Sequence, residues 1–154
     1  MNSRLNGAIM LFGWKKYERL GDEFFKLGSN NPPYEHSQIL AVSSDNSIAA
    51  ATGRDNTIEI YHLDARRHLL TLSGHEGHRI LDLHFAPDNR TLVSAGHFAR
   101  EPRIWDTETG QLLSEIPLHA DNPTRSIDSA AFSPDGRWLA TGTNGESGSV
   151  RLWD

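Results

Sequence analysis

Short apolar runs bounded by turn-forming clusters follow one another along most of the chain. Three of these runs end on an aromatic residue flanked by aliphatic ones: TIEIYHL at 57–63, PRIWD at 102–106 and SVRLWD at 149–154. Runs of this length and composition are typical of β-strands, and the sequence lacks the 3.6-residue period of an amphipathic helix. The pattern predicts an all-β protein of short antiparallel strands and disfavours a solenoid of helical repeats.

The apolar runs recur at a nearly constant interval, which indicates internal repeats. Aromatic residues at corresponding places are 44 to 49 residues apart, at Phe12, Tyr61, Trp105 and Trp153. Acidic residues ahead of them repeat in step, at Asp45, Asp88 and Asp135. Two independent markers in one register argue against a chance repeat.

Two segments have the composition of hairpin turns. In FSPDGRW at 132–138, Pro134 presets φ, Asp135 can accept from nearby backbone N–H groups, and Gly136 tolerates a positive φ. DTETGQLL at 106–113 is a second hairpin connection, with Gly110 as its left-handed residue. Each repeat therefore supplies four short strands.

The sequence resembles the WD-repeat family of β-propellers. The resemblance rests on Gly74-His75, the FSPDG turn and the Trp-Asp pairs at 105–106 and 153–154. It extends over about 37–154, while 7–27 resembles only the last two strands of a preceding blade. It implies strands c and d of a partial blade plus a linker at 1–35, then blades at 36–73, 74–116 and 117–154.

Within each blade, the family places strand a against the central channel and strand d outermost. The expected strands a are 37–42, 79–85 and 126–132; strands b are 48–52, 91–95 and 138–142; strands c end at Tyr61, Trp105 and Trp153; strands d are 68–73 and 111–116. The third blade lacks strand d, so we expect an incomplete, open propeller with an exposed edge at 150–153.

The resemblance also implies a hydrogen-bonded network in each blade, in which a histidine, a hydroxyl residue on strand b, a tryptophan on strand c and an aspartate stabilise one another. The second blade offers His75, Ser94 and Trp105 but no aspartate in its b–c loop, HFAREP. The first offers Asp55, but Tyr61 replaces the tryptophan and Ala51 replaces the hydroxyl residue. The third offers Thr141 and Trp153, with His119 as the candidate histidine and no aspartate in NGESGS.

Catalytic and metal-binding alternatives find little support. The HEGH segment has two histidines three residues apart, not four apart on a helix as in zincins. We predict that His75 is structural and that His84 faces the channel or a neighbouring blade. Asp106 and Glu108 are interpreted as solvated turn residues. A hydrolase or lyase would need His78, His84 and His119 to converge, so no catalytic residue, metal or cofactor is assigned.

Composition narrows the class of partner. The 154 residues carry a formal net charge of −5, which disfavours a nucleic-acid binder. Without cysteine, disulfides and thiolate chemistry are excluded. No apolar run approaches the roughly 20 residues of a membrane span, and no targeting signal is recognisable, so we expect a cytoplasmic protein.

Propellers usually bind partners through the d–a and b–c loops at one end of the channel. In this chain the d–a loops are 75–79 and 119–125, and the b–c loops are 53–56, 97–101 and 144–147. Arginine and aromatic residues are frequent at interface hot spots, and the candidate partner-binding residues are His78, Arg79, Phe98, Arg100 and Arg125. Stacking of a sugar or peptide on Trp138 and Phe98 is the weaker alternative.

The predicted function is therefore a non-enzymatic WD-repeat scaffold for protein–protein contacts, part of a larger signalling or regulatory protein. Expected partners are other proteins or peptides, together with missing blades supplied by a longer form of the chain or by another subunit. No nucleic acid or membrane partner is expected.

Overall fold

The structure is a computed structural model of the chain, and it describes residues 39–75, 77–97, 101–116, 126–143 and 148–154. In the N-terminal region it describes only the backbone of four strands of two residues each. These are β1 (Ala8–Ile9), β2 (Phe12–Gly13), β3 (Glu18–Arg19) and β4 (Phe25–Lys26). β1 pairs with β4 and β2 with β3, both antiparallel. Their assignment to a preceding blade stays a prediction.

Blade 1 is a four-stranded antiparallel sheet in the order β5-β6-β7-β8. Its strands are β5 (Leu40–Val42), β6 (Ile48–Thr52), β7 (Ile58–His62) and β8 (Arg67–Leu72). A single 3-10 turn, η1 (Arg54–Asn56), forms the b–c loop between β6 and β7. The sheet is built as the repeat pattern predicts, from consecutive strands joined by short turns.

Blade 2 repeats this order as β9-β10-β11-β12, and blade 3 contains three strands, β13-β14-β15. The strands of blade 2 are β9 (Ile80–Phe85), β10 (Thr91–Gly96), β11 (Arg103–Asp106) and β12 (Leu112–Glu115). Those of blade 3 are β13 (Ser129–Phe132), β14 (Leu139–Thr143) and β15 (Ser149–Trp153). Each strand assigned from the sequence lies within three residues of its place in the structure.

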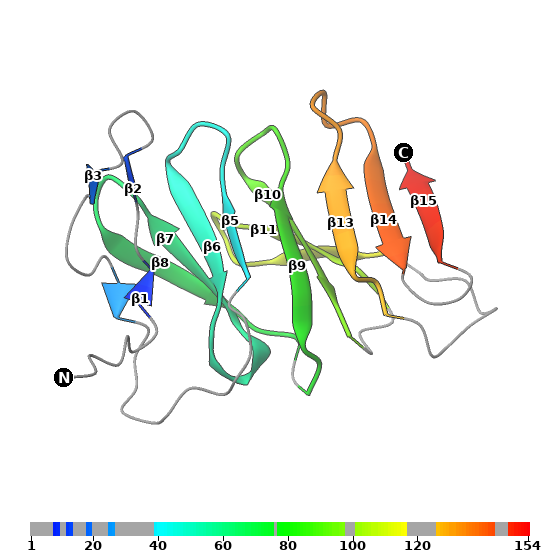
Figure 1. Cartoon of the computed structure of the whole chain (residues 1–154), viewed down its shortest axis with the longest axis horizontal. Helices are drawn as coiled ribbons and strands as arrows, with labels where there is room; N and C mark the ends of the chain where they lie inside the picture. Colours follow the sequence, from blue (N-terminus) through cyan, green and yellow to red (C-terminus); the bar gives the residue numbers. More distant parts are fainter. Residues whose placement is uncertain are drawn as a thin grey trace.

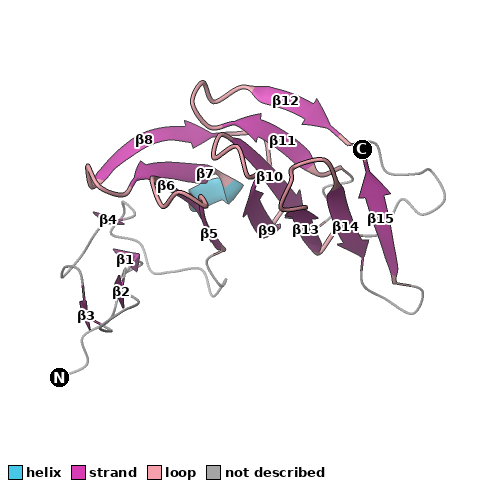
Figure 2. Cartoon of the chain, turned by 90° about the horizontal axis from the view of Figure 1, so that it is seen from above, coloured by secondary structure: helices cyan, strands magenta, loops and turns pink. Residues whose placement is uncertain are grey.

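The three sheets stand side by side in an open arc (Figure 1). Seen from above, β5, β9 and β13 follow one another along the inner side, while β8 and β12 lie on the outer side (Figure 2). This arrangement confirms the all-β class and the incomplete propeller.

Two apolar clusters join the blades. The first packs Ala50, Ile58, Ile60 and Leu72 of blade 1 against Ile80, Leu83, Phe85, Leu92 and Trp105 of blade 2. The second packs Val93 and Ala95 of blade 2 against Ile127, Ala130 and Leu139 of blade 3, with Trp153 half-buried at its margin. The core therefore lies between sheets, as expected when each twisted sheet buries one face on the next.

We call the side of a blade that packs on the following blade its far face. Paired strands place Ala41, Ala50 and Ile60 in one row on the far face of blade 1. The same register aligns His84, Val93 and Ile104 in blade 2, and Ala131, Ala140 and Leu152 in blade 3. The first two rows pack against a neighbouring blade, whereas Leu152 is 67% exposed and its face-mate Val150 is 76% exposed.

The repeated aspartates organise the a–b turns. Asp45 Oδ1 accepts from the Ser43 hydroxyl at 2.7 Å, and Asp135 Oδ1 accepts from the Ser133 hydroxyl at 2.5 Å. Gly136 and Gly110 have φ values of 72° and 77°, in the left-handed region that glycine adopts without a steric penalty. These turns have the chemistry predicted for them.

In the described part of the chain, no helix is long and apolar enough to cross a membrane.

Candidate functional site

A buried hydrogen-bonded chain links the d–a loop of blade 2 to its strands b and c. Ser94 Oγ lies 2.6 Å from His75 Nε2 and accepts from Trp105 Nε1–H at 2.8 Å. All three side chains are at most 2% exposed. The contacts hold the d–a loop against the sheet while giving each buried polar atom of Ser94 and Trp105 a partner.

His75 Nδ1 is buried and has no hydrogen-bond partner among the described residues. If the Ser94 hydroxyl donates to Nε2, the remaining ring proton sits on Nδ1 as a donor. An aspartate would accept there in a complete network. Burial, followed by the positive charges of Arg103 and His78, lowers the pKa of His75 to about 4, so the imidazole is neutral at neutral pH.

The other two blades carry different polar contacts. In blade 3, Trp153 Nε1–H donates to Thr141 Oγ1 at 3.0 Å. In blade 1, Asp55 is exposed in η1, and Glu59 instead accepts from the Thr71 hydroxyl at 2.7 Å and pairs with His68 at 2.8 Å. Burial and the nearby Glu59 charge raise the pKa of Tyr61 to about 12.

Blades 2 and 3 are also joined by polar contacts. Asp82 Oδ2 accepts from the Ser129 hydroxyl and from the Ala130 backbone N–H, both at 2.9 Å. His84 Nδ1 accepts from the Phe132 backbone N–H at 3.2 Å. Since these N–H groups belong to the innermost strand of blade 3, Asp82 and His84 satisfy part of its open edge. His84 thus faces a neighbouring blade, as predicted.

The expectation that Asp106 is a solvated turn residue is wrong. Asp106 is buried, and Arg90 donates to its Oδ2 through Nε at 3.0 Å and through a terminal nitrogen at 2.7 Å. This pairing, with the Thr109 and Glu108 backbone N–H groups, lowers the pKa of Asp106 to about 2. Arg90 also pairs with Glu108 at 3.0 Å, and the Glu108 side chain is 71% exposed as expected.

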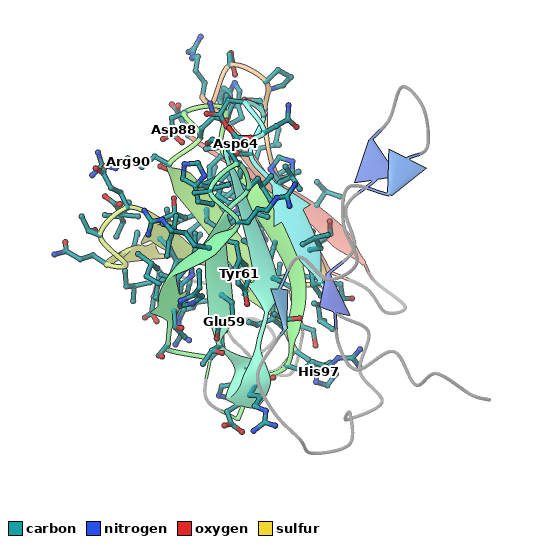
Figure 3. All side chains as sticks on the ribbon, turned by 90° about the vertical axis from the view of Figure 1, so that its left-hand side faces the viewer. Glu59, Tyr61, Asp64, Asp88, Arg90 and His97 are labelled. Atoms are coloured by element: carbon teal, nitrogen blue, oxygen red, sulfur yellow. The ribbon has the colours of Figure 1, made fainter. Side chains whose placement is uncertain are left out.

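The two ends of the arc carry different side chains. Asp64, Asp88 and Arg90 lie at the end formed by the a–b and c–d turns, and His97 of the b–c loop lies at the opposite end (Figure 3). His78 and Arg79 precede β9 at that second end. Arg79 is exposed and takes part in an interaction, and His78 Nδ1 is buried.

The candidates Phe98, Arg100, Arg125 and His119 lie outside the described residues. The full set of predicted rim residues therefore stays a prediction.

In the described parts of the chain, no group of three or more histidine, aspartate or glutamate side chains is placed to hold a metal ion. Of the three histidines in the catalytic alternative, His84 already uses Nδ1 to bind a backbone N–H. The polar side chains described above hold strands and loops in place.

Each family match covers the outer strand of one blade and the first three strands of the next. Residues 66–106 and 110–154 match the WD domain, G-beta repeat family. The chain is also 32% identical over 120 residues, 77% of its length, to an uncharacterised WD repeat-containing protein of Synechocystis sp.. This chain belongs to the WD-repeat family of β-propeller proteins.

Two further relatives carry functional names. The chain is 32% identical over 123 residues to target of rapamycin complex subunit wat1 of Schizosaccharomyces pombe, covering 79% of this chain and 34% of that protein. It is 29% identical over 113 residues to target of rapamycin complex subunit LST8 of Mus musculus, covering 73% of this chain and 32% of that protein. The chain spans about a third of the length of the curated relatives it matches.

Sequence reasoning missed the side chains that bridge separate elements: Glu59, Asp82 and Arg90. Asp82 sits between Leu81 and Leu83 on a mostly apolar strand, and a carboxylate there requires a partner once the strand is packed. The apolar neighbours of Asp82 were the only sequence signal for its bridging role. The partners of Asp82 lie 47 and 48 residues away, so the sequence alone did not identify them.

Proposed function

We propose that this chain is a non-enzymatic scaffold that binds other proteins or peptides, as part of a larger signalling or regulatory assembly. The observation that carries the proposal is the row of WD-repeat blades, whose polar side chains are engaged in holding blade to blade and loop to strand. Relatives named as subunits of a target of rapamycin complex support a role in multiprotein assemblies. A cytoplasmic location stays part of this proposal.

The binding surface that we propose is the end of the arc formed by the d–a and b–c loops. His78 and Arg79 border β9 at this end, and the sequence adds Phe98, Arg100 and Arg125. The buried His75–Ser94–Trp105 chain supports the proposal, because it fixes the loop that carries His78 and Arg79 and so reduces the entropy lost on binding. We also propose that further blades, from a longer form of the chain or another subunit, cover the open faces.

The test is affinity capture with the full chain and a triple variant, Arg79→Ala, Phe98→Ala and Arg100→Ala. We expect broad loss of the proteins captured by the unmodified chain. The matched control is Arg137→Ala with Trp138→Ala, which removes an arginine and a 41%-exposed aromatic at the opposite end of blade 3. Equal capture by the triple variant would reject the rim site, and loss in the control alone would favour stacking on Trp138.

A further inference from the structure

The d–a loop of blade 2 holds two buried ring nitrogens that lack a partner within the described residues. These are His75 Nδ1 and His78 Nδ1. Both histidines belong to one tight turn, in which the His78 N–H donates to the His75 carbonyl at 2.9 Å. After burial and Arg103, His78 is the next contributor to the lowered pKa of His75, so the two rings lie close together. A buried polar atom without a partner keeps the cost of its desolvation, so a group that pairs with both atoms gains free energy.

The hydrogen bonds of Ser94 decide which ring nitrogen of His75 carries the proton. An indole N–H can only donate, so Ser94 Oγ accepts from Trp105 Nε1–H at 2.8 Å. The hydroxyl proton of Ser94 then needs an acceptor in the interior, and among the described residues His75 Nε2, at 2.6 Å, is the one it has. Because the imidazole is neutral at neutral pH, its own proton lies on Nδ1. His75 Nδ1 is therefore a hydrogen-bond donor that lacks an acceptor.

The charges around this donor favour an anionic acceptor over a metal ion. The Arg103 guanidinium donates to the Gly74 carbonyl at the start of the loop. A nitrogen that carries a proton cannot ligate a metal, and a neighbouring guanidinium repels a cation but attracts a carboxylate. Arg103 Nε also donates to Glu115 Oε1 at 2.8 Å, so this carboxylate is already engaged. Within the described residues, no carboxylate bonds to His75 Nδ1.

The turn offers a route by which a ligand can approach. Gly77, between the two histidines, is exposed and has a φ of 74°. No described atom beyond its chain neighbours lies within 4 Å of the position that its Cβ would take. The b–c loop is tied to the same end of the blade, because the His97 N–H donates to the Arg79 carbonyl at 2.7 Å (Figure 3). The turn is thus held at its C-terminal side and uncovered at Gly77.

We propose that this turn binds a carboxylate of a partner protein, an aspartate or glutamate side chain in an acidic segment, which accepts from the Nδ1–H groups of His75 and His78. A carboxylate has two acceptor oxygens, so a single side chain serves both ring nitrogens. The segment approaches over Gly77, and the turn opens to admit the carboxylate. This inference rests on the loop surface proposed above and specifies the chemistry that this surface recognises.

The probe is a labelled peptide, AEEEA, with both ends blocked, and its neutral counterpart is AQQQA. Titration against the full chain, followed by fluorescence anisotropy, should show saturable binding that is about tenfold tighter or more for AEEEA, since hydrogen bonds to a charged acceptor are the stronger ones.

Two variants remove the donors separately. His75→Gln places an amide near the position of Nε2, where it can contact Ser94, and has no donor at the position of Nδ1. His78→Ala removes the second ring nitrogen. Each should weaken AEEEA binding by about tenfold or more. The matched control is His62→Ala, beside the c–d turn of blade 1 at the other end of the arc, which should change the affinity by less than about twofold.

Proton NMR of the unmodified chain gives a readout that does not depend on how well a variant folds. Burial slows the exchange of His75 Nδ1–H with water, and the loss of this resonance in His75→Gln assigns it. AEEEA should move the resonance downfield as the N–H donates to a carboxylate, and AQQQA should leave it in place. Zinc chloride should also leave it in place, because the protonated nitrogen does not ligate a cation.

Several outcomes would overturn the inference: no saturable binding up to about 1 mM, equal binding of the two peptides, or an Nδ1–H resonance that AEEEA does not move. Loss of that resonance on adding zinc would make the turn a cation site instead. A shift caused by Glu76→Gln in the free chain would show that the chain's own carboxylate occupies the site. AEEEA binding that Arg79→Ala abolishes, but His75→Gln and His78→Ala do not, would reject this site and leave the proposed loop surface standing.

Discussion

At the residue scale, one hydroxyl oxygen supports two buried side chains. Ser94 Oγ contacts both the His75 imidazole and the Trp105 indole, and all three groups are shielded from water. A buried polar group that loses its partner keeps the full cost of its desolvation. This small network therefore has a larger influence on stability than its two contacts alone would suggest.

Replacing Ser94 by alanine should destabilise the folded chain by about 1–3 kcal/mol, because it leaves the Trp105 N–H and His75 Nε2 unpaired in the interior. Urea unfolding followed by tryptophan fluorescence measures the change. Ser114→Ala makes the same substitution on the exposed strand β12 and should shift the free energy of unfolding by less than about 0.5 kcal/mol. Equal effects of the two variants would contradict the role assigned to Ser94.

The buried imidazole also predicts a pH dependence. The pKa of His75 falls from an ordinary 6.5 to about 4 on folding, so below 6.5 the unfolded chain binds a proton that the folded chain does not. Stability should therefore decline as pH falls from 6.5 to about 4, by about 3 kcal/mol from this group, and its contribution should level off below that.

His75→Gln removes the titrating group and isolates its contribution from that of the other histidines. Urea unfolding of both proteins at several pH values between 4 and 7.5 should show a gap in stability that changes across this window. A constant gap would show that His75 is not buried as a neutral imidazole.

At the scale of elements, each blade buries one face of its sheet against its neighbour and, at the inner edge of the sheet, forms hydrogen bonds with it. Asp82 bonds Ser129 and Ala130 of the innermost strand of blade 3. In blade 1, Ala41 of β5 and the preceding Ile39 pack against the cluster shared with blade 2. The blade 2–blade 3 contact is thus partly polar. The blade 1–blade 2 contact combines its apolar cluster with Asn89 Oδ1, which accepts from the Ser44 hydroxyl at 2.8 Å and from the Asp45 N–H at 3.2 Å.

Asp82→Ala should loosen blade 3 selectively. Hydrogen bonds to a charged group contribute about 1.5–3 kcal/mol, and about 1.4 kcal/mol corresponds to a tenfold change in an equilibrium constant. Amide exchange in β13, at Ala130 above all, should therefore accelerate by tenfold or more. Exchange in β6 and β7 of blade 1 should stay unchanged. The control is Asp64→Ala, an exposed aspartate in the c–d turn of blade 1; uniform acceleration along the chain would argue against a blade-specific contact.

At the scale of the whole molecule, the open arc leaves apolar side chains uncovered. Val150 and Leu152 of β15 are 76% and 67% exposed, on the face that would pack against a further blade. Burying a side chain of this size contributes about 1.5–3 kcal/mol, so covering this face is favourable whichever surface does so. Exposed strand edges add to the tendency to associate.

We therefore predict that the 154-residue chain alone is not a stable closed monomer. Size-exclusion chromatography with light scattering at several concentrations should show concentration-dependent oligomers or poor solubility. Leu152→Asp should shift the distribution toward the 17.2 kDa monomer, because a charge on the exposed face opposes its burial, whereas Arg137→Asp should not. A monodisperse, cooperatively unfolding wild-type monomer would contradict the prediction.

Repeat length, blade order and turn chemistry were all readable from the sequence, because they depend on local properties. A turn such as 133–136 carries its own proline, aspartate and glycine, and the strand aromatics recur at a nearly constant interval. The His75, Ser94 and Trp105 set was also identifiable, since a motif at matching positions implied it. Local signals of this kind do not depend on how the blades meet.

Only the tertiary structure decided which polar side chains serve the contacts between elements. Asp106, assigned to solvent from its place in a turn, is buried because Arg90 reaches it across the sheet from 16 residues away. Asp82 and His84 acquire partners only when β13 comes to lie beside β9. Contacts of this kind, between residues far apart in the chain, leave no local pattern in the sequence.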